Sequence, residues 1–237
     1  MQFECVSRTH VGLKRKINED SILAESDRGL WVVADGMGGH HSGEVASAAV
    51  VDALRRLPDY EDLDRLTRTA VESIRQVNDE LIRLARSNGS DRTIGTTVVG
   101  LLIAGQRFRC FWAGDSRAYW FRAGEIMRLS RDHSLVQDLI DAGMLTPEEA
   151  EAHESANVIT RAVGVREKLE VDTVSGDAQP GDFFLLASDG LTRLVDDGEI
   201  AGELANGSLE QAADKLIDTV LERGAPDNVS LIITRVL

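Results

Sequence analysis

Apolar residues gather along the chain into short runs, which is the pattern of buried β-strands. The runs are FECVS (3–7), SILAE (21–25), LWVVA (30–34), TVVGLLIA (97–104), RFRCFWA (107–113), RAYWFR (117–122), FFLLA (183–187) and VSLIIT (229–234). They are rich in β-branched and aromatic residues. Very short connections, AGQR (104–107) and RAGE (122–125), join neighbouring runs. Such connections are typical of antiparallel hairpins.

Three other segments, 43–57, about 61–86 and about 209–223, show helical periodicity. In the second, apolar residues recur three or four positions apart and form one stripe. The stripe consists of Leu63, Leu66, Ala70, Ile74, Val77, Leu81 and Leu84. The third begins with a capping-box pattern, Ser208 and Gln211, and stops at Gly224. Many hairpin strands with amphipathic helices predict an α+β layered fold, with antiparallel sheet inside and helices outside.

Residues 134–165 break this pattern. They are more polar than their surroundings and indicate short helices and loops inserted between strands, like a flap. The chain has no internal repeat and no low-complexity linker. We therefore expect a single domain over residues 1–237, a length at which one domain can still bury one core.

Charge and composition narrow the setting. The net charge of −14 disfavours nucleic acids and anionic membranes as partners. No run approaches the roughly 18 apolar residues of a membrane helix, and the N-terminal MQFECVSRTH lacks the apolar stretch of a signal peptide. Cys5 and Cys110 are far apart in sequence and lack metal-site spacing, which favours small core residues in a reducing compartment. We expect a cytoplasmic protein.

Four aspartates stand at the ends of predicted strands. Asp35 closes WVVAD, Asp115 follows FWAG, Asp189 follows LLAS, and Asp227 precedes VSLIIT. Taken singly, each is more typical of a turn than of a ligand. If the strand ends share one edge of a sheet, the four carboxylates lie close together. Oxygen ligands without cysteine or paired histidine favour hard cations, Mg²⁺ or Mn²⁺.

The glycines after Asp35 are compatible with a phosphate-binding loop, a metal site or an ordinary turn. A dinucleotide fingerprint is excluded because His41 stands where the third glycine is required, and no Walker lysine follows. Ser188 lies in A-S-D-G rather than in a G-x-S-x-G elbow. Gly36 would let its backbone carbonyl serve as a metal ligand. We interpret Asp197-Gly198 as an ordinary turn.

A second polar segment, GLKRKINEDS (12–21), holds Arg15, Glu19 and Asp20 just before a strand. Alone it is typical of a charged loop. If it joins the same sheet edge, Arg15 can bind an anion over a metal cluster.

Taken together, these motifs resemble the metal-dependent protein serine/threonine phosphatases (the PPM or type-2C family) in their bacterial form. The resemblance covers nearly the whole chain, in the order of the family. The matching pieces are G-x-x-R-x-x-N-E-D at 12–20, DGMGGHHSGEVAS at 35–47, GTT at 95–97, GDSRAY at 114–119, DHS at 132–134, ITRAVG at 159–164, SDGL at 188–191 and DNVS at 227–230.

The resemblance implies a central antiparallel β-sandwich flanked by helices on both sides, in α-β-β-α layers, with two Mn²⁺ or Mg²⁺ ions at one end. It implies that Asp35 bridges the two ions and that the Gly36 carbonyl binds one of them. Asp189 and Asp227 should bind the other ion. Glu19 occupies a position that is a ligand in some members only.

Further roles follow from the same resemblance. Asp20 should orient the attacking water, and Arg15 should bind the substrate phosphate. Asp115 should contribute to a third, weaker metal site. The histidine that eukaryotic members use as general acid is replaced here by Met37. His40, three residues on, is the candidate substitute, and the alternative, slightly favoured, is that His40 and His41 shape the loop and the helix start.

The implied activity is hydrolysis of phosphoserine and phosphothreonine by a metal-bridging water, opposing a bacterial serine/threonine kinase. The expected partners are that kinase and its phosphorylated substrates, and the chain itself is expected to be a monomer. Two alternatives stay open: a phosphatase-like module that binds phosphoproteins without turnover, and a hydrolase of small phosphoesters.

Overall fold

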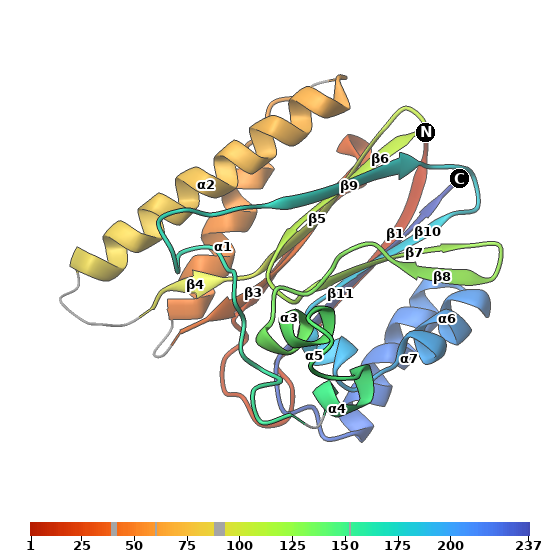
Figure 1. The fold of residues 1–237 in the computed structure, drawn as a ribbon. Coiled ribbons are helices and arrows are strands. Elements are labelled where there is room, and N and C mark those ends of the chain that lie inside the picture. The colour runs from red at the N-terminus through yellow and green to blue at the C-terminus, as the bar shows by residue number, and fades with distance from the viewer. Residues whose placement is uncertain (39–41, 60, 88–92, 152) are drawn as a thin grey trace.

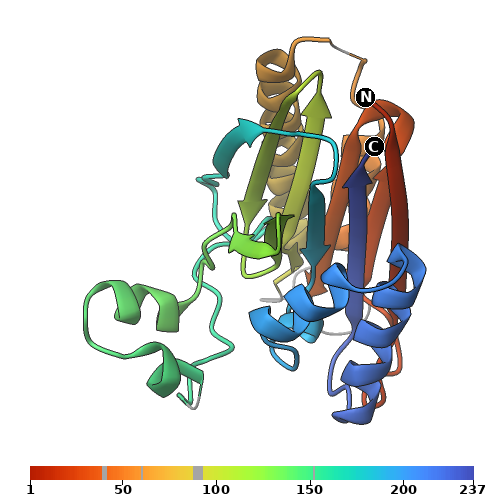
Figure 2. The same ribbon diagram turned by 90° about the vertical axis from the view of Figure 1, so that its right-hand side faces the viewer.

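A computed structural model describes residues 1–237 except 39–41, 60, 88–92 and 152. Two antiparallel sheets pack face to face (Figures 1 and 2). One sheet contains, in spatial order, β1 (Phe3–His10), β11 (Val229–Val236), β10 (Phe183–Ala187), β7 (Arg117–Arg122) and β8 (Glu125–Arg128). The other contains β2 (Asp20–Glu25), β3 (Leu30–Met37), β5 (Val98–Ala104), β6 (Arg107–Ala113) and β9 (Asp172–Asp177), with β4 (Gly95–Thr96) paired to β3. A 3₁₀ turn, η1 (Ser26–Arg28), joins β2 to β3.

Helices cover both outer faces of the sandwich. On one side lie α1 (Ser42–Arg55) and the long α2 (Leu63–Ser87) (Figure 1). On the other side lie α5 (Asp189–Thr192), α6 (Asp197–Ala205) and α7 (Leu209–Glu222). The expected α-β-β-α layering is confirmed. Among the described helices, none combines the length and the apolar character needed to cross a membrane.

The hydrophobic core has three parts that follow the layers. Between the sheets, Trp31, Phe108 and Phe184 are almost completely buried. A second part joins the outer face of the β3 sheet to α1 and α2, whose apolar stripe includes the buried Ile74. A third joins the opposite sheet to α7 through residues such as Leu216. Each sheet is thus packed against the other sheet on one face and against helices on the other.

Residues 134–165 lie between β8 and β9 and extend away from the sandwich (Figure 2). They contain two short helices, α3 (Leu135–Asp141) and α4 (Pro147–Glu151). Ser134 caps α3, since its hydroxyl accepts a hydrogen bond from the backbone N–H of Gln137. We call 134–165 the flap segment.

One sequence interpretation is wrong. Asp197-Gly198, expected to form an ordinary turn, instead opens α6. Asp196 and Glu199 form a capping box at its start, with each side chain accepting from the other residue's backbone N–H. An Asp-Gly pair in a helical first turn is compatible with the helix dipole, which favours an acid there. The strands β4, β8 and β9 were also not predicted.

Candidate metal and phosphate site

Strand β3 carries Asp35 near its C-terminal end. In the register of the sheet, Asp35 lies directly opposite Asp20 of β2. Its backbone is fixed on the other side by Thr97. The Asp35 N–H donates to Thr97 Oγ1 at 3.1 Å, and its carbonyl accepts from the Thr97 N–H at 2.8 Å. Two carboxylates are therefore placed side by side by the sheet itself.

Gly36 lies where no side chain fits. A Cβ built there would be 2.2 Å from the carbonyl oxygen of Gly43 and 2.5 Å from that of Glu19. The Gly36 N–H donates to that Glu19 carbonyl at 3.1 Å. Glu19 also accepts at Oε1 from the Gly43 N–H at 3.1 Å, at the start of α1. The glycine thus permits close approach of three segments around Asp35.

Two further acids reach the same end from the opposite sheet. Asp189 is the first residue of α5, directly after β10, and Asp227 directly precedes β11. Because β10 and β11 are antiparallel neighbours, these two strand termini share one edge. The neighbour of Asp189, Ser188, donates from Oγ to Asp20 Oδ2 at 2.9 Å, which joins the two sheets at this point.

Asn228 fixes the loop that carries Arg15. Its amide nitrogen donates to the carbonyls of Val11 and Ile17 at 2.8 and 3.0 Å, and its Oδ1 accepts from the Glu19 N–H at 2.8 Å. The Arg15 guanidinium donates to Asp227 Oδ2 at 2.7 Å and keeps 51% of its side chain exposed. A cation therefore stands at the rim of the acidic cluster, open to a ligand from solvent.

The carboxylates strongly perturb one another. Burial, followed by the charges of Asp189, Asp20 and Asp115, raises the pKa of Asp35 well above its ordinary value. Burial likewise raises the pKa of Asp20 to about 6, against hydrogen bonds from Ser230 and Ser188 that lower it. Four acids held in this way favour a cation among them.

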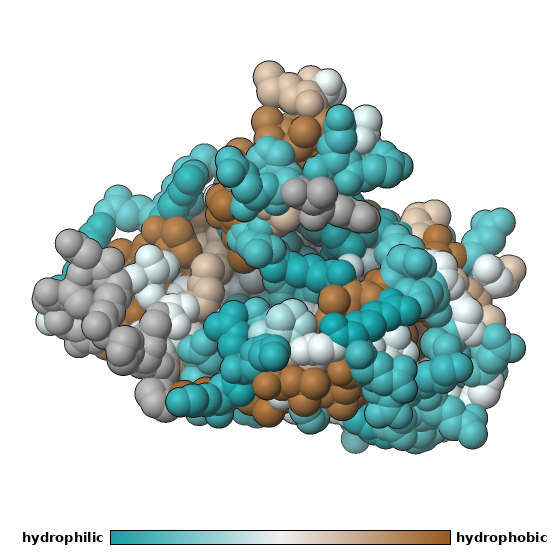
Figure 3. All heavy atoms as spheres, turned by 90° about the horizontal axis from the view of Figure 1, so that it is seen from below, coloured by the Kyte–Doolittle hydropathy of each residue, from teal (hydrophilic) through white to brown (hydrophobic). Residues whose placement is uncertain are grey.

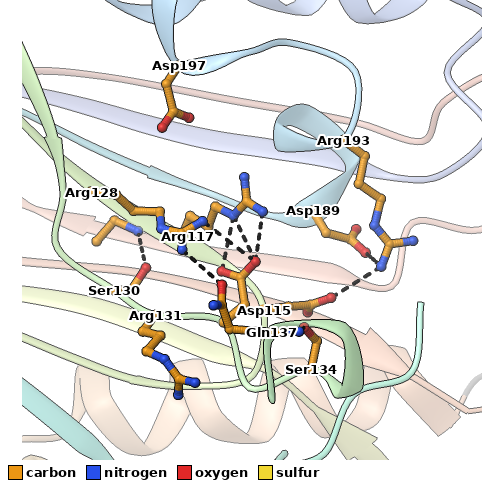
Figure 4. Close-up of polar contacts among 12 residues, drawn as sticks. Asp115, Arg117, Arg128, Ser130, Arg131, Ser134, Gln137, Asp189, Arg193 and Asp197 are labelled. Carbon is orange, nitrogen blue, oxygen red and sulfur yellow. Dashed lines mark hydrogen bonds and ion pairs between the residues drawn. The ribbon is translucent and has the colours of Figure 1, made fainter. Parts of the chain in front are cut away.

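Asp115 joins the cluster through an arginine. Burial and the nearby Asp189 raise its pKa to about 7, and Arg193 opposes the shift. Figure 4 shows the carboxylates of Asp115 and Asp189 pointing toward the guanidinium of Arg193. The Arg193 Nη2 lies 2.6 Å from Asp189 Oδ2 and 3.2 Å from Asp115 Oδ2.

The donor set fits hard divalent ions by its chemistry. It consists of carboxylates and a carbonyl beside a glycine, and oxygen ligands of this kind suit Mg²⁺ and Mn²⁺. Buried oxygens of Asp20 and Asp115, Oδ1 in each, have no hydrogen-bond partner among the described residues. Within the same part of the chain, no group of three or more acidic, histidine or cysteine side chains is already spaced to hold a metal ion. Asp227 is instead paired with Arg15, and the buried Asp189 is paired with Arg193.

The residues expected from the sequence are brought to one end of the sandwich, apart from His40, which lies outside the described residues. Sequence reasoning missed Arg193, although an aspartate and an arginine four apart on a helical turn are a recognisable pair. It also missed the support of the Asp115 loop. Arg117 donates from Nε to both oxygens of Asp132 at 3.1 Å and from Nη2 to Asp132 Oδ2 at 2.7 Å.

His133 supports the same loop. Its Nδ1 accepts from the Gly114 N–H at 3.1 Å, and its Nε2 lies 3.1 Å from Asp172 Oδ2. The Asp132-His133 pair belongs to the DHS motif, which was the available signal for both supports.

Seen from below, this end of the molecule is largely hydrophilic, interrupted by patches of hydrophobic residues (Figure 3).

The chain is similar to known proteins over nearly its whole length. The serine/threonine protein phosphatase PstP of Mycobacterium tuberculosis is 37% identical over 231 residues, which is 98% of this chain and 44% of that protein. The chain thus spans less than half the length of this relative. A solved structure described as PppA, a key regulatory component of T6SS in Pseudomonas aeruginosa, superposes with a TM-score of 0.93 at 40% identity, covering 100% of this chain and 99% of that one.

A third comparison concerns metals. The catalytic domain of the phosphatase PstP, solved in complex with two manganese ions, superposes with a TM-score of 0.88 at 35% identity, covering 98% of this chain and 97% of that one. Residues 10–231 of the chain match the family described as Protein phosphatase 2C. With the sandwich, its acidic edge and these matches in place, we conclude that the chain belongs to the protein phosphatase 2C family.

Proposed function

We propose that this chain is a metal-dependent phosphoprotein phosphatase that hydrolyses phosphoserine and phosphothreonine. The observation that carries the proposal is the buried acidic cluster of Asp20, Asp35, Asp115 and Asp189, whose pKa values are raised by burial and by one another. Such a cluster has little use in a purely structural role, because it costs stability unless cations offset the repulsion. Family membership and the manganese-bound relative support the same reading.

In this proposal the metal ligands are Asp35, the Gly36 carbonyl, Asp189 and Asp227, with Glu19 as a further candidate. Two Mn²⁺ or Mg²⁺ ions held there would lower the pKa of water and neutralise charge on the phosphoryl group.

The other residues have roles of their own. Asp20 accepts from Ser188 at one carboxylate oxygen and has its buried Oδ1 unpartnered among the described residues, which suits it to orient the attacking water. Arg15 would bind the phosphate through nitrogens not used by Asp227, since a guanidinium offers five N–H donors. His40 is the candidate proton donor to the leaving group.

The wider setting is also proposed. A serine/threonine phosphatase of bacterial type would oppose a serine/threonine kinase by acting on its substrates. We propose a single catalytic domain over residues 1–237, monomeric and cytoplasmic, in which the flap segment borders the site. The support for the bordering position is the contact between Arg193 and Asn157, a residue of the flap segment.

The test is release of phosphate from a phosphothreonine peptide, with Mn²⁺, with Mg²⁺ and with EDTA. We expect turnover with metal, none with chelator, and loss of turnover in Asp35→Asn. An aryl phosphate assayed in parallel separates a protein phosphatase from a hydrolase restricted to small phosphoesters. Peptide binding without turnover would instead identify a binding module and overturn the proposal.

A further inference from the structure

Arg193 places a guanidinium between two carboxylates from different strand ends. Its Nη2 contacts Asp189 Oδ2 at 2.6 Å and Asp115 Oδ2 at 3.2 Å (Figure 4). The Asp189 side chain is 12% exposed and that of Asp115 only 7%. Because Arg193 contacts two buried acids, it belongs to the acidic cluster and is not an isolated surface residue.

The position of Arg193 is set by the short helix α5. The Arg193 N–H donates to the Asp189 carbonyl at 3.0 Å, so one helical turn places the two side chains on the same side. The Arg193 Nη1 also donates to Asn157 Oδ1 in the flap segment. One guanidinium thus connects α5, the Asp115 loop and the flap segment.

The guanidinium of Arg193 contacts two carboxylates, as a bound metal cation would. Arg193 occupies Asp115 Oδ2 and Asp189 Oδ2, two carboxylate oxygens of the kind that a divalent ion on this side would bind. A divalent ion and a guanidinium repel each other strongly at such distances. With 37% of its side chain exposed, Arg193 has solvent beside it into which it can move.

We infer that Arg193 supplies the cation at Asp115 and competes there with a divalent metal ion. This inference rests on the proposed phosphatase function and concerns the third, weaker metal expected at Asp115. In this chain, a third ion binds at Asp115 only when the guanidinium moves away from Asp115 Oδ2. The same movement frees Asp189 Oδ2, which belongs to a residue assigned to one of the other two ions. That movement also releases Asn157, so occupancy of the Asp115 side is coupled to the hold on the flap segment.

Calorimetric titration of Mn²⁺ into the chelator-treated chain tests the competition directly. We expect Arg193→Gln to tighten the weakest binding step by about tenfold or more, or to reveal a step that the wild type lacks. The matched control is Arg122→Gln. Arg122 donates to both oxygens of the buried Asp182 at 2.6 Å, at the other end of β7 from the site. The Arg122→Gln variant should therefore bind Mn²⁺ as the wild type does.

Melting temperature gives a readout independent of activity. In EDTA, Arg193→Gln should melt below wild type because Asp115 and Asp189 lose their cation. In saturating Mn²⁺, this deficit should shrink or vanish. Arg122→Gln should show the same deficit in both conditions, because Asp182 loses a partner that no metal replaces. If Arg193→Gln does not fold, Arg193→Lys takes its place. Lysine keeps the charge but lacks the planar guanidinium that donates to two acceptors at once, so the changes in Mn²⁺ affinity and melting temperature should be smaller and in the same direction.

The outcomes separate this inference from the proposed function. A wild-type chain that binds Mn²⁺ and hydrolyses phosphopeptide, with the weakest affinity unchanged in Arg193→Gln, overturns the role of Arg193 alone. A deficit in melting temperature that persists in Mn²⁺ does the same. A wild-type chain that neither binds Mn²⁺ nor releases phosphate overturns the proposed function itself.

Discussion

The guanidinium of Arg15 donates to the carboxylate of Asp227 across 2.7 Å, although 212 positions separate the two residues in the chain. Asn228 makes this contact possible by fixing the backbone at Val11, Ile17 and Glu19. The pairing leaves half of Arg15 exposed, so the same guanidinium is available to a phosphate.

Arg15→Ala should therefore raise KM for a phosphothreonine peptide by roughly tenfold or more, as expected for loss of a charge-assisted contact. We expect little change in melting temperature, because exposed ion pairs contribute only about 0–1 kcal/mol. The control is Arg8→Ala, which removes an arginine paired with Asp214 at 2.6 Å outside the site. Steady-state kinetics on the three proteins decide, and an unchanged KM and kcat would place Arg15 outside the site.

Asp35→Asn and Asp189→Asn should each abolish most turnover and leave the fold intact. In EDTA, Asp35→Asn should melt at or above the wild-type temperature, because removing one charge relieves repulsion in the buried cluster. Asp189→Asn should melt below the wild type in EDTA, because it also loses the buried ion pair with Arg193. Asp182→Asn is the opposite control, since Asp182 is buried with Arg122 as its cation and its loss should destabilise. Near-wild-type kcat in either site variant at saturating Mn²⁺ would contradict the ligand role.

Gly36→Ala should destabilise the protein and weaken Mn²⁺ binding together. The added methyl group would meet backbone oxygens at 2.2 and 2.5 Å, which cannot move without displacing α1 or β2. Gly202→Ala is the matched control. Gly202 lies within α6 with open space around its Cβ position, so alanine should stabilise it by about 0.5–1 kcal/mol. Thermal melts and calorimetry on both variants test the contrast; a Gly36→Ala protein as stable as wild type would contradict it.

Stability should depend on pH through His133. Burial lowers its pKa below 6.5, with Asp172 opposing and Arg161 adding to the shift. The unfolded state binds a proton at His133 more readily than the folded state does. The contribution of neutral His133 to the free energy of unfolding is therefore complete above about pH 6.5 and is lost as the pH falls toward the pKa of the folded state. Denaturant unfolding of wild type and His133→Gln between pH 7 and 5 measures it. The wild type should lose more stability than the variant on acidification, and parallel curves would contradict the assignment.

Local sequence determined most of the elements. The hairpin strands β5 to β7 match the predicted runs to within one residue, because their apolar side chains are buried on both faces. The end of α7 and its capping box were also read correctly, since Ser208 and Gln211 act within four residues. The motifs and their order along the chain identified the family, because each motif is a short contiguous stretch that can be found in the sequence without the fold.

Tertiary structure decided what depends on pairing between distant segments. Strand β9, DTVSGD, alternates in exposure and has no apolar run, because it lies at a sheet edge and is held by backbone pairing to β6. The partner of Arg193 could be anticipated at Asp189, one helical turn away. Its contact with Asp115, 78 residues distant, could not, because it exists only once β7 and β10 pair and bring their ends to one edge of the sheet.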